Sequence, residues 1–230
     1  MDIRILKQSA KRALEGKWWI AIGALVIYEI INSLVNSSIS SNHWIENNVT
    51  FSIFSSIGFL ITIPLQAGID WLFLDIYDGK EVSLQQIFDG FKQYGKVLGA
   101  SILIGLFTVL WSLVFIIPGI IKSISYSQTI YILKENPELG IKEAIEESQR
   151  LMDGYKGIYF ILLLQFIGWL LVPLIGSIIV ITLLLSGLSI FITLILGILS
   201  LIGLIASIFY LLPYYSTIFS GFYRELPNKR

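Results

Sequence analysis

The stretch "IYFILLLQFIGWLLVPLIGSIIVITLLLSGLSIFITLILGILSLIGLIASIFYLL", residues 158–212, decides the fold. It runs for 55 residues without one charged side chain. A helix needs about 20 apolar residues to cross the hydrocarbon core of a bilayer, so this stretch is too long for one crossing and suits two. We expect the chain to turn near Ser186-Gly187. The stretch therefore predicts a hairpin of two membrane-spanning helices.

Four more apolar segments lie between this hairpin and the amino terminus. They are residues 18–39, 51–77, 97–117 and 120–133. Pro64 is expected to kink the second, and Pro118-Gly119, a tight-turn signal, to end the third. The fourth is short and rather polar, and is expected to cross the membrane inside the protein. Together the segments predict an all-α, polytopic membrane bundle of six transmembrane helices, with residues 1–230 forming a single membrane domain.

The composition excludes several kinds of catalytic and metal-binding site. Of 230 residues, 55% are apolar and 14% charged, whereas soluble proteins have roughly a quarter charged residues. The chain has no Cys and a single His, which excludes disulfides, cysteine zinc sites, thiol nucleophiles, iron–sulfur clusters and multi-histidine metal sites. It also has no protease signature and no phosphate-binding loop. The sequence thus predicts no enzyme, no cofactor, no metal and no nucleic-acid partner.

The distribution of Lys and Arg predicts the orientation. Cytoplasmic ends of spanning segments carry an excess of these residues. With six crossings, fifteen of the sixteen basic residues fall on the side of the two termini, and Lys122 is the exception. We therefore expect both termini in the cytoplasm. Lys122 is expected to snorkel to the outer face or to reach toward Glu29.

The charged segment "NPELGIKEAIEESQRLMDGYKG", residues 136–157, then lies on the cytoplasmic side. Glu143 follows Gly140 by three residues, as in a capping box that lacks the hydroxyl, and Asp153-Gly154 supplies a helix stop. One face is apolar, and shorter apolar stripes occur near residues 3 and 82. The three stripes are Ile141, Ala144, Ile145, Ser148, Leu151, Met152 and Tyr155; Ile3, Leu6, Ala10, Ala13 and Leu14; and Val82, Leu84, Ile87 and Phe91. They predict amphipathic interfacial helices on the cytoplasmic side, apolar face toward the membrane.

A pattern recurs three times along the chain. The segments "ALEGKWW", "IFDGFKQYGK" and "LMDGYKG" each give an apolar residue, an acid, Gly and then Lys, followed by a spanning segment. Matching charged exits, each after a Tyr, read "DIYDGK", "IYILKEN" and "GFYREL". Two explanations stay open: three repeated units, or the common needs of any cytoplasmic helix start. The units would be residues 3–79, 82–135 and 140–226.

Several of these segments resemble a known family. They are "IRILKQSAKRALEGKWW", "FDGFKQYGK", "FIGWLL", "FYREL" and the long block "LVFIIPGIIKSISYSQTIYILKENPELGIKEAIEESQRLMDGYKG". The chain resembles an uncharacterised bacterial family of integral membrane proteins, domain of unknown function 975, common in Gram-positive organisms. It departs from the family at Gly140 and in the longer apolar stretch 172–204. More distantly, it is similar to the membrane domain of some glycerophosphodiester phosphodiesterases, whose catalytic domain is absent. The resemblance implies the bacterial cytoplasmic membrane and brings no activity.

Polar residues within the apolar segments are the candidate site. An acid at the centre of a spanning helix costs roughly 3 kcal/mol, so it is a functional hypothesis by default. Glu29 occupies such a position, and Asp70 lies one turn after Gln66. Against this, Glu29 could be protonated or bond Asn32, and Asp70 could meet Lys17. The possible intramembrane polar site consists of Glu29, Asn32, Gln66, Asp70, Lys122, Gln128 and Gln165.

Two functions compete. The first is a non-enzymatic membrane module that binds phospholipid or a membrane peptide, or that serves a larger membrane assembly. The second is a small secondary transporter or exporter, including one for peptides or for immunity to antimicrobial peptides. A transporter predicts a wet, polar pocket around Glu29 and Asp70. A lipid-binding module predicts a dry core and an apolar groove open to the inner leaflet.

Overall fold

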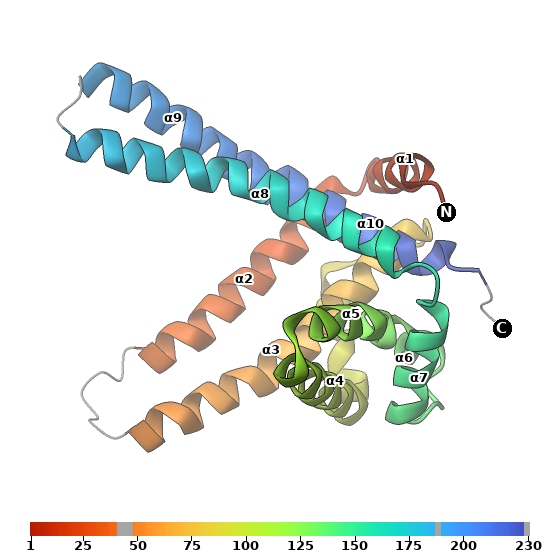
Figure 1. Cartoon of the computed structure of the whole chain (residues 1–230). Helices are drawn as coiled ribbons and strands as arrows, with labels where there is room; N and C mark the ends of the chain where they lie inside the picture. Colours follow the sequence, from red (N-terminus) through yellow and green to blue (C-terminus); the bar gives the residue numbers. More distant parts are fainter. Residues whose placement is uncertain (41–47, 187–189, 228–230) are drawn as a thin grey trace.

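The computed structural model describes the backbone of residues 1–40, 48–186 and 190–227 (Figure 1). The elements within these ranges are all helical. They are α1 (Ile3–Leu14), α2 (Trp18–Ser40), α3 (Asn48–Tyr77), η1 (Leu84–Gln93), α4 (Tyr94–Val114), α5 (Ile116–Tyr126), α6 (Thr129–Glu135), α7 (Ile141–Leu151), α8 (Lys156–Leu185), α9 (Ile190–Ala206), η2 (Ser207–Leu211) and α10 (Leu212–Glu225). Among the described residues, five helices are long and apolar enough to cross a membrane. The chain thus has the make-up of a multi-pass membrane protein.

Three helical hairpins diverge from a common base. Figure 1 shows α2–α3 and α8–α9 splayed apart, with α4 seen nearly end-on below α5. The base consists of α1, η1, α6, α7, α10 and the second half of α3. The expected compact bundle is therefore wrong for the outer parts of the hairpins. The physical reason is that lipid tails are as apolar as Leu, so packing hairpins together gains no hydrophobic energy.

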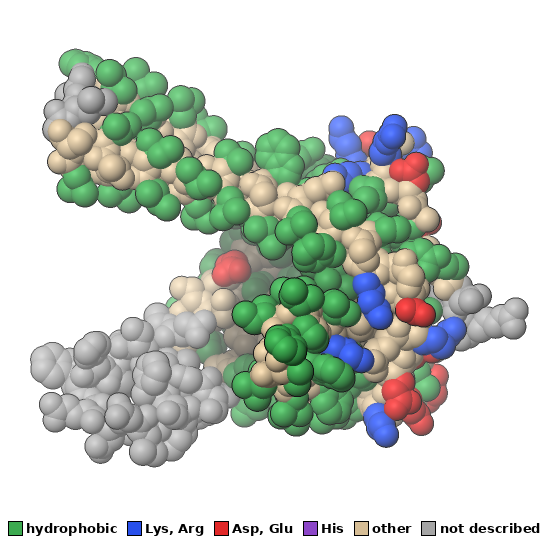
Figure 2. Space-filling view, in the orientation of Figure 1, with side chains coloured by type: hydrophobic (Ala, Val, Ile, Leu, Met, Phe, Trp, Pro, Cys, Tyr) green, Lys and Arg blue, Asp and Glu red, His purple; other side chains and the backbone are tan. Residues whose placement is uncertain are grey.

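The base holds the protein core. In the span Gly58–Tyr77 of α3, 61% of the residues are buried, against 6% in α8. Around α3 pack the buried sides of α1, α6 and α10, with Leu6, Tyr131 and Phe222 among the core residues. Charged side chains gather at this same end of the molecule (Figure 2). The base is therefore both the packed end and the charged end.

The amphipathic helices α1 and α7 bury the faces that their sequences predict. Leu6, Ala10 and Leu14 of α1 are buried, as are Ala144, Ile145, Ser148 and Leu151 of α7. These faces meet protein rather than lipid, because α1 packs on α10 and α3, and α7 on α4, α5 and α6. The amide of Gly140 donates to Glu143 Oε2 at 2.8 Å, which confirms the half capping box.

The segment η1 differs from the expected stripe. It is a 3₁₀ helix that buries Ile87 and Gly90, while Leu84 and Phe91 remain exposed. Three residues per turn place Ile87 and Gly90 in one column and turn Phe91 away from it. A Cβ added at Gly90 would lie 1.9 Å from the carbonyl oxygen of Pro64, and one at Gly68 equally close to that of Ile87. Two glycines thus let η1 lie directly against α3.

The third and fourth apolar segments also depart from expectation. The turn falls at Phe115, and Pro118-Gly119 lie inside the first turns of α5, where a helix tolerates Pro. The fourth segment is split into α5 and α6 around residues 127–128. Ser148 of α7 fills the break: its hydroxyl donates to the Ser125 carbonyl at 2.8 Å and accepts from the Gln128 amide at 3.1 Å. That hydroxyl satisfies backbone groups that the helix leaves unpaired.

The turn between α8 and α9 begins at Ser186, as expected; Gly187 lies outside the described residues. Glycine stops are confirmed at Gly16 and Gly154, whose φ angles are 76° and 78°. Gly79, in the exit after α3, has φ 74°. Left-handed backbone is readily adopted by Gly alone, so these positions end helices.

Candidate functional site

The polar residues of the apolar segments do not form one core. Gln66 and Asp70 do meet: Gln66 Nε2 donates to Asp70 Oδ1 at 3.0 Å. The expected contact of Asp70 with Lys17 is wrong, because Lys17 Nζ donates to the carbonyl of Lys80 at 2.6 Å. The four-residue spacing on one helix accounts for the first pair, whereas Lys17 is held by a turn that only the fold brings close.

Lys122 does not contact Glu29. Its Nζ donates to Gln149 Oε1 of α7 at 3.1 Å and lies 5.1 Å from the ring centroid of Trp111. The expected Glu29–Lys122 pair is therefore wrong. Lys122 extends along α5 toward the base, where α7 offers a polar partner and Trp111 a cation–π contact.

Gln128 is fully buried at the break between α5 and α6. Its Nε2 donates to Ser127 Oγ at 2.7 Å, and its Oε1 has no hydrogen-bond partner. Ser127, Thr129 and Ser125 each donate to a backbone carbonyl three or four residues earlier. These polar contacts satisfy backbone and side-chain groups at the break between α5 and α6.

Glu29 and Asn32 both lie on α2, exposed and half-buried respectively. Glu29 lines a groove of about 610 Å³ between α2 and the η2–α10 segment. Its lining is apolar apart from Glu29 and Ser33: Ile22, Leu25, Val26, Ile30, Leu34, Ile208 and Leu212 complete it. Asp70 is not part of this groove. The polar pocket expected for a transporter is thus not formed around the two acids.

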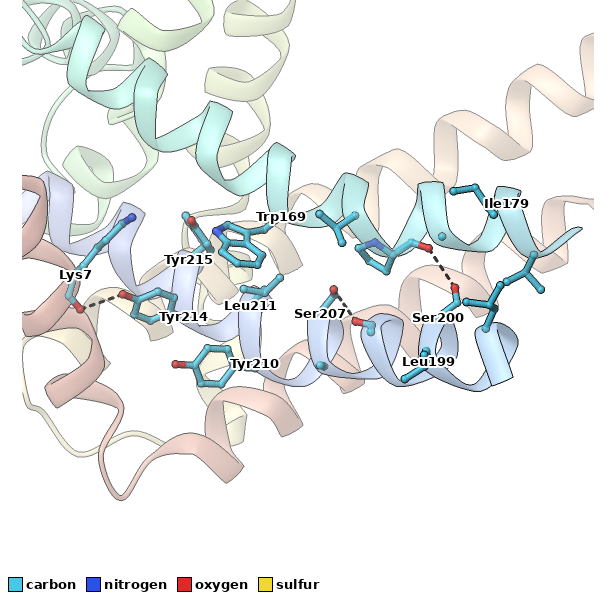
Figure 3. A pocket seen from close by; sticks show the side chains of 17 residues that line it. Lys7, Trp169, Ile179, Leu199, Ser200, Ser207, Tyr210, Leu211, Tyr214 and Tyr215 are labelled. Carbon is cyan, nitrogen blue, oxygen red and sulfur yellow. Dashed lines mark hydrogen bonds between the residues drawn. The ribbon is translucent and has the colours of Figure 1, made fainter. Parts of the chain in front are cut away.

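A second groove lies along the third hairpin (Figure 3). It measures about 700 Å³ and runs between α8 and the α9–η2–α10 segment. Its volume is within the roughly 300–1,000 Å³ typical of ligand clefts. Ile179 and Leu199 lie toward the outer end, and Lys7 of α1 lies at the base end. Lys7 Nζ donates to Gln165 Oε1 at 2.6 Å, although Gln165 itself does not line the groove.

Aromatic residues surround the base end of this groove. Tyr210, Tyr214, Tyr215 and Trp169 line it, and Trp169 is 59% exposed. Tyr214 Oη donates to the Lys7 carbonyl at 3.4 Å, which ties α10 to α1. Trp and Tyr concentrate where membrane meets water. The groove therefore has an aromatic, basic end and an apolar end.

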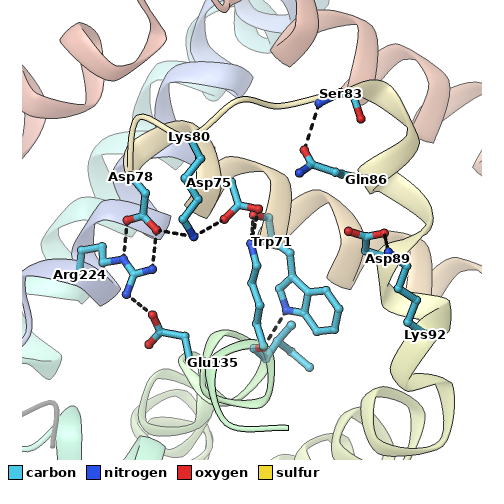
Figure 4. Close-up of polar contacts among 12 residues, drawn as sticks. Trp71, Asp75, Asp78, Lys80, Ser83, Gln86, Asp89, Lys92, Glu135 and Arg224 are labelled. Atoms are coloured by element: carbon cyan, nitrogen blue, oxygen red, sulfur yellow. Dashed lines mark hydrogen bonds and ion pairs between the residues drawn. The ribbon is translucent and has the colours of Figure 1, made fainter.

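An ionic network joins three helices of the base (Figure 4). Asp75 of α3 pairs with Lys80 at 2.8 Å and with Lys134 of α6 at 2.6 Å. Arg224 of α10 pairs with Asp78 at 2.5 Å, and also with Glu135. These residues come from the three charged exits "DIYDGK", "IYILKEN" and "GFYREL". The motifs were visible in the sequence, but their convergence was not predicted.

The network sets the protonation of its members outside the spans. Partial burial opposes ionisation of Asp78, but hydrogen bonds from Arg224 and Lys80 outweigh it and hold the pKa of Asp78 below its ordinary value. The hydrogen bond to Asp75 raises the pKa of Lys80 despite desolvation. Each shift favours the charged form. Asp78 and Lys80 are thus held in their charged forms.

Comparison with known protein families identifies the family of this chain. The family model described as "Protein of unknown function (DUF975)" matches residues 1–125 and 113–230, which together cover the whole chain. The chain belongs to this uncharacterised family. No curated protein and no solved structure matches it.

Proposed function

We propose that the protein is a non-enzymatic membrane protein that binds an anionic phospholipid in the groove between α8 and α9–α10. The observation that carries the proposal is the composition of this groove, apolar along α8 and α9 and basic at one end through Lys7. An acyl chain would lie against the apolar part. The phosphate would lie beside Lys7, at the level of the aromatic residues.

The charge of Lys7 is available to such a headgroup. Its Nζ contacts the neutral amide of Gln165, and the ion pairs among the described residues do not include it. The amide orients the ammonium without neutralising it, and two of its three N–H groups remain to donate. A basic residue near an anionic membrane surface contributes about 1 kcal/mol to lipid binding.

The proposed setting is a bacterial cytoplasmic membrane with both termini in the cytoplasm. Under this proposal the chain crosses six times, and α5 with α6 forms the broken fourth crossing. The 20 residues of 116–135 would extend about 30 Å, the thickness of the hydrocarbon core. The base, where charged residues gather, would lie at the inner interface with α1, η1 and α7 upon it. The order short helix, then hairpin, occurs three times, which supports three repeated units.

A small transporter or exporter, of peptides or otherwise, is the less supported alternative. It required Glu29 and Asp70 to share a polar pocket, and the groove beside Glu29 excludes Asp70. A membrane peptide as the ligand of the Lys7 groove is also less supported, because the groove offers a single charge at one end, as a phospholipid requires.

The test is lipid retention measured by native mass spectrometry on the full chain, purified from membranes supplemented with phosphatidylglycerol and phosphatidylcholine. Lys7→Gln should weaken phosphatidylglycerol retention about fivefold, the equivalent of about 1 kcal/mol. The exposed Lys11 of the same helix is the control, because it does not line the groove. Equal retention by wild type, Lys7→Gln and Lys11→Gln would contradict the proposal.

A second pair of variants tests the apolar part. Leu199→Trp places a larger side chain in the groove, whereas Leu194→Trp makes the same change outside it. Leu199 and Leu194 are 59% and 58% exposed, so both variants should fold equally well. The proposal requires that the former lose bound lipid and the latter keep it.

A further inference from the structure

Glu29 is an acid without a cation at the centre of a spanning helix. It is the twelfth of the 23 residues of α2, and it lies exposed in the 610 Å³ groove. No ion pair in the described part of the chain includes it. Intramembrane acids are rare, and they pair with another group or line a water-filled path. Because the groove is apolar around the carboxylate, Glu29 requires a group that pairs with it.

Within the part of the chain that the structure describes, no cation pairs with Glu29. Lys122 is the one basic residue within the predicted apolar segments, and its Nζ contacts Gln149 and Trp111. Lys7, the other cation beside a groove, belongs to the opposite side of α10 and contacts Gln165. A second copy of this chain carries the same cations in the same places. The missing cation therefore belongs to a different molecule.

The depth of Glu29 decides what kind of molecule this is. Eleven residues separate it from Trp18, the first residue of α2, which is about 17 Å along the helix. Half the hydrocarbon core is about 15 Å. A headgroup amine of a phospholipid lies at the interface and does not reach this level. A Lys or Arg in the middle of a transmembrane helix does.

We propose that the groove between α2 and the η2–α10 segment docks a transmembrane helix of another protein that carries a Lys or Arg at mid-span. Glu29 pairs with this cation. Ile30, Leu34 and Ile208, which are 52%, 61% and 49% exposed, give the helix its apolar contacts. Ser33 provides a small residue where the backbones approach. The site is distinct from the Lys7 groove and does not depend on lipid binding there.

The experiment uses the full chain in phosphatidylcholine vesicles and two synthetic transmembrane peptides of about 20 Leu and Ala residues. The peptides differ at one central position, Lys in one and Leu in the other. Association is measured by energy transfer between labelled peptide and labelled protein at pH 7.5. We expect the Lys peptide to associate about tenfold more strongly. Glu29→Gln should lower its association to the level of the Leu peptide, and the control Glu81→Gln, outside the spans, should not.

Crosslinking then locates the peptide. The chain has no Cys, so a single introduced cysteine reports one position. A cysteine about one turn from the central Lys of the peptide should crosslink to Leu34→Cys and not to Leu113→Cys, an exposed position on α4. Equal association of both peptides, or no loss in Glu29→Gln, overturns the proposal. So does an equal preference for the Lys peptide in Glu29→Gln and wild type.

Discussion

The base and the hairpins of this protein differ in what their side chains contact. In the base, side chains pack against one another and charges pair across α3, α6 and α10. In the hairpins, apolar side chains point outward, so that only 6% of α8 is buried. In a membrane the outward side chains gain little from packing on protein, because lipid solvates them equally well. The comparison teaches that contacts within the protein define the base, whereas the hairpins leave most of their apolar side chains exposed.

The largest expected contrast is between two phenylalanines. Phe222 of the base is fully buried, whereas Phe191 of α9 is 76% exposed. Phe222→Ala should lower the free energy of unfolding by about 3 kcal/mol, because a cavity remains in the core. Phe191→Ala should change it by less than about 0.5 kcal/mol, since lipid contacts the site before and after unfolding. Unfolding of both variants in mixed micelles, followed by tryptophan fluorescence, measures the difference. Similar losses would contradict the division into base and hairpins.

A smaller effect is expected at the contact of η1 with α3. Gly68→Ala places a methyl group 1.9 Å from a backbone oxygen, so η1 must move. We expect a loss of about 2 kcal/mol, in the range of overpacked cores. Gly105→Ala on α4 is the matched control, because no atom lies within 4 Å of the added carbon. That variant should be neutral or slightly more stable, as Ala favours a helix. A tolerated Gly68→Ala would mean that η1 does not lie directly against α3.

The ionic network should contribute less than the core. Arg224→Ala removes one charged partner from each of Asp78 and Glu135, which keep Lys80 and Tyr223 and are 14% and 28% exposed. We expect a loss of about 1–2 kcal/mol, below that of a broken, fully buried pair. The exposed pair of Lys142 with Glu146, 83% and 61% exposed, is the control. Lys142→Ala should cost no more than about 0.5 kcal/mol in the same unfolding assay.

The pH dependence of the same variant sharpens this test. The pKa of Asp78 is lower in the folded protein than its ordinary value of about 3.9. A depressed pKa gives stability that is present above the ordinary value and is lost as the pH falls toward the folded one. The wild type should therefore lose stability below about pH 4. Arg224→Ala should lose less over this interval, and an unchanged acid response would show that Arg224 does not hold the Asp78 pKa down.

Local signals in the sequence predicted much of the fold. The 55 uncharged residues of 158–212 predicted one hairpin. Gly16 and Gly154 indicated the ends of helices. Gln66 and Asp70 were placed together because four residues on a helix share a face. In each case the cause lies within a few turns of the chain, where periodicity and backbone geometry are sufficient.

The remaining features depend on residues that are distant in the sequence. Ser148 of α7 forms the hydrogen bonds at the break between α5 and α6. Gly90 allows a close contact with α3 and does not end a helix. Lys7 meets Gln165 across 158 residues. The three charged exits were recognised as similar, yet their pairing required the arrangement of α3, α6 and α10. No periodicity encodes such contacts, so the Lys7 groove could not be predicted either.

The docking of α1 on α10 has a consequence for biosynthesis. Its contact surface lies about 200 residues further along the chain, so α1 leaves the ribosome long before its partner is made. During that interval α10 is not yet present to cover the apolar face formed by Leu6, Ala10 and Leu14, and α3 covers only part of it. The membrane surface is the medium that accommodates such a face. Translation thus orders the assembly: hairpins insert one after another, and the base closes last, when α10 displaces lipid from α1.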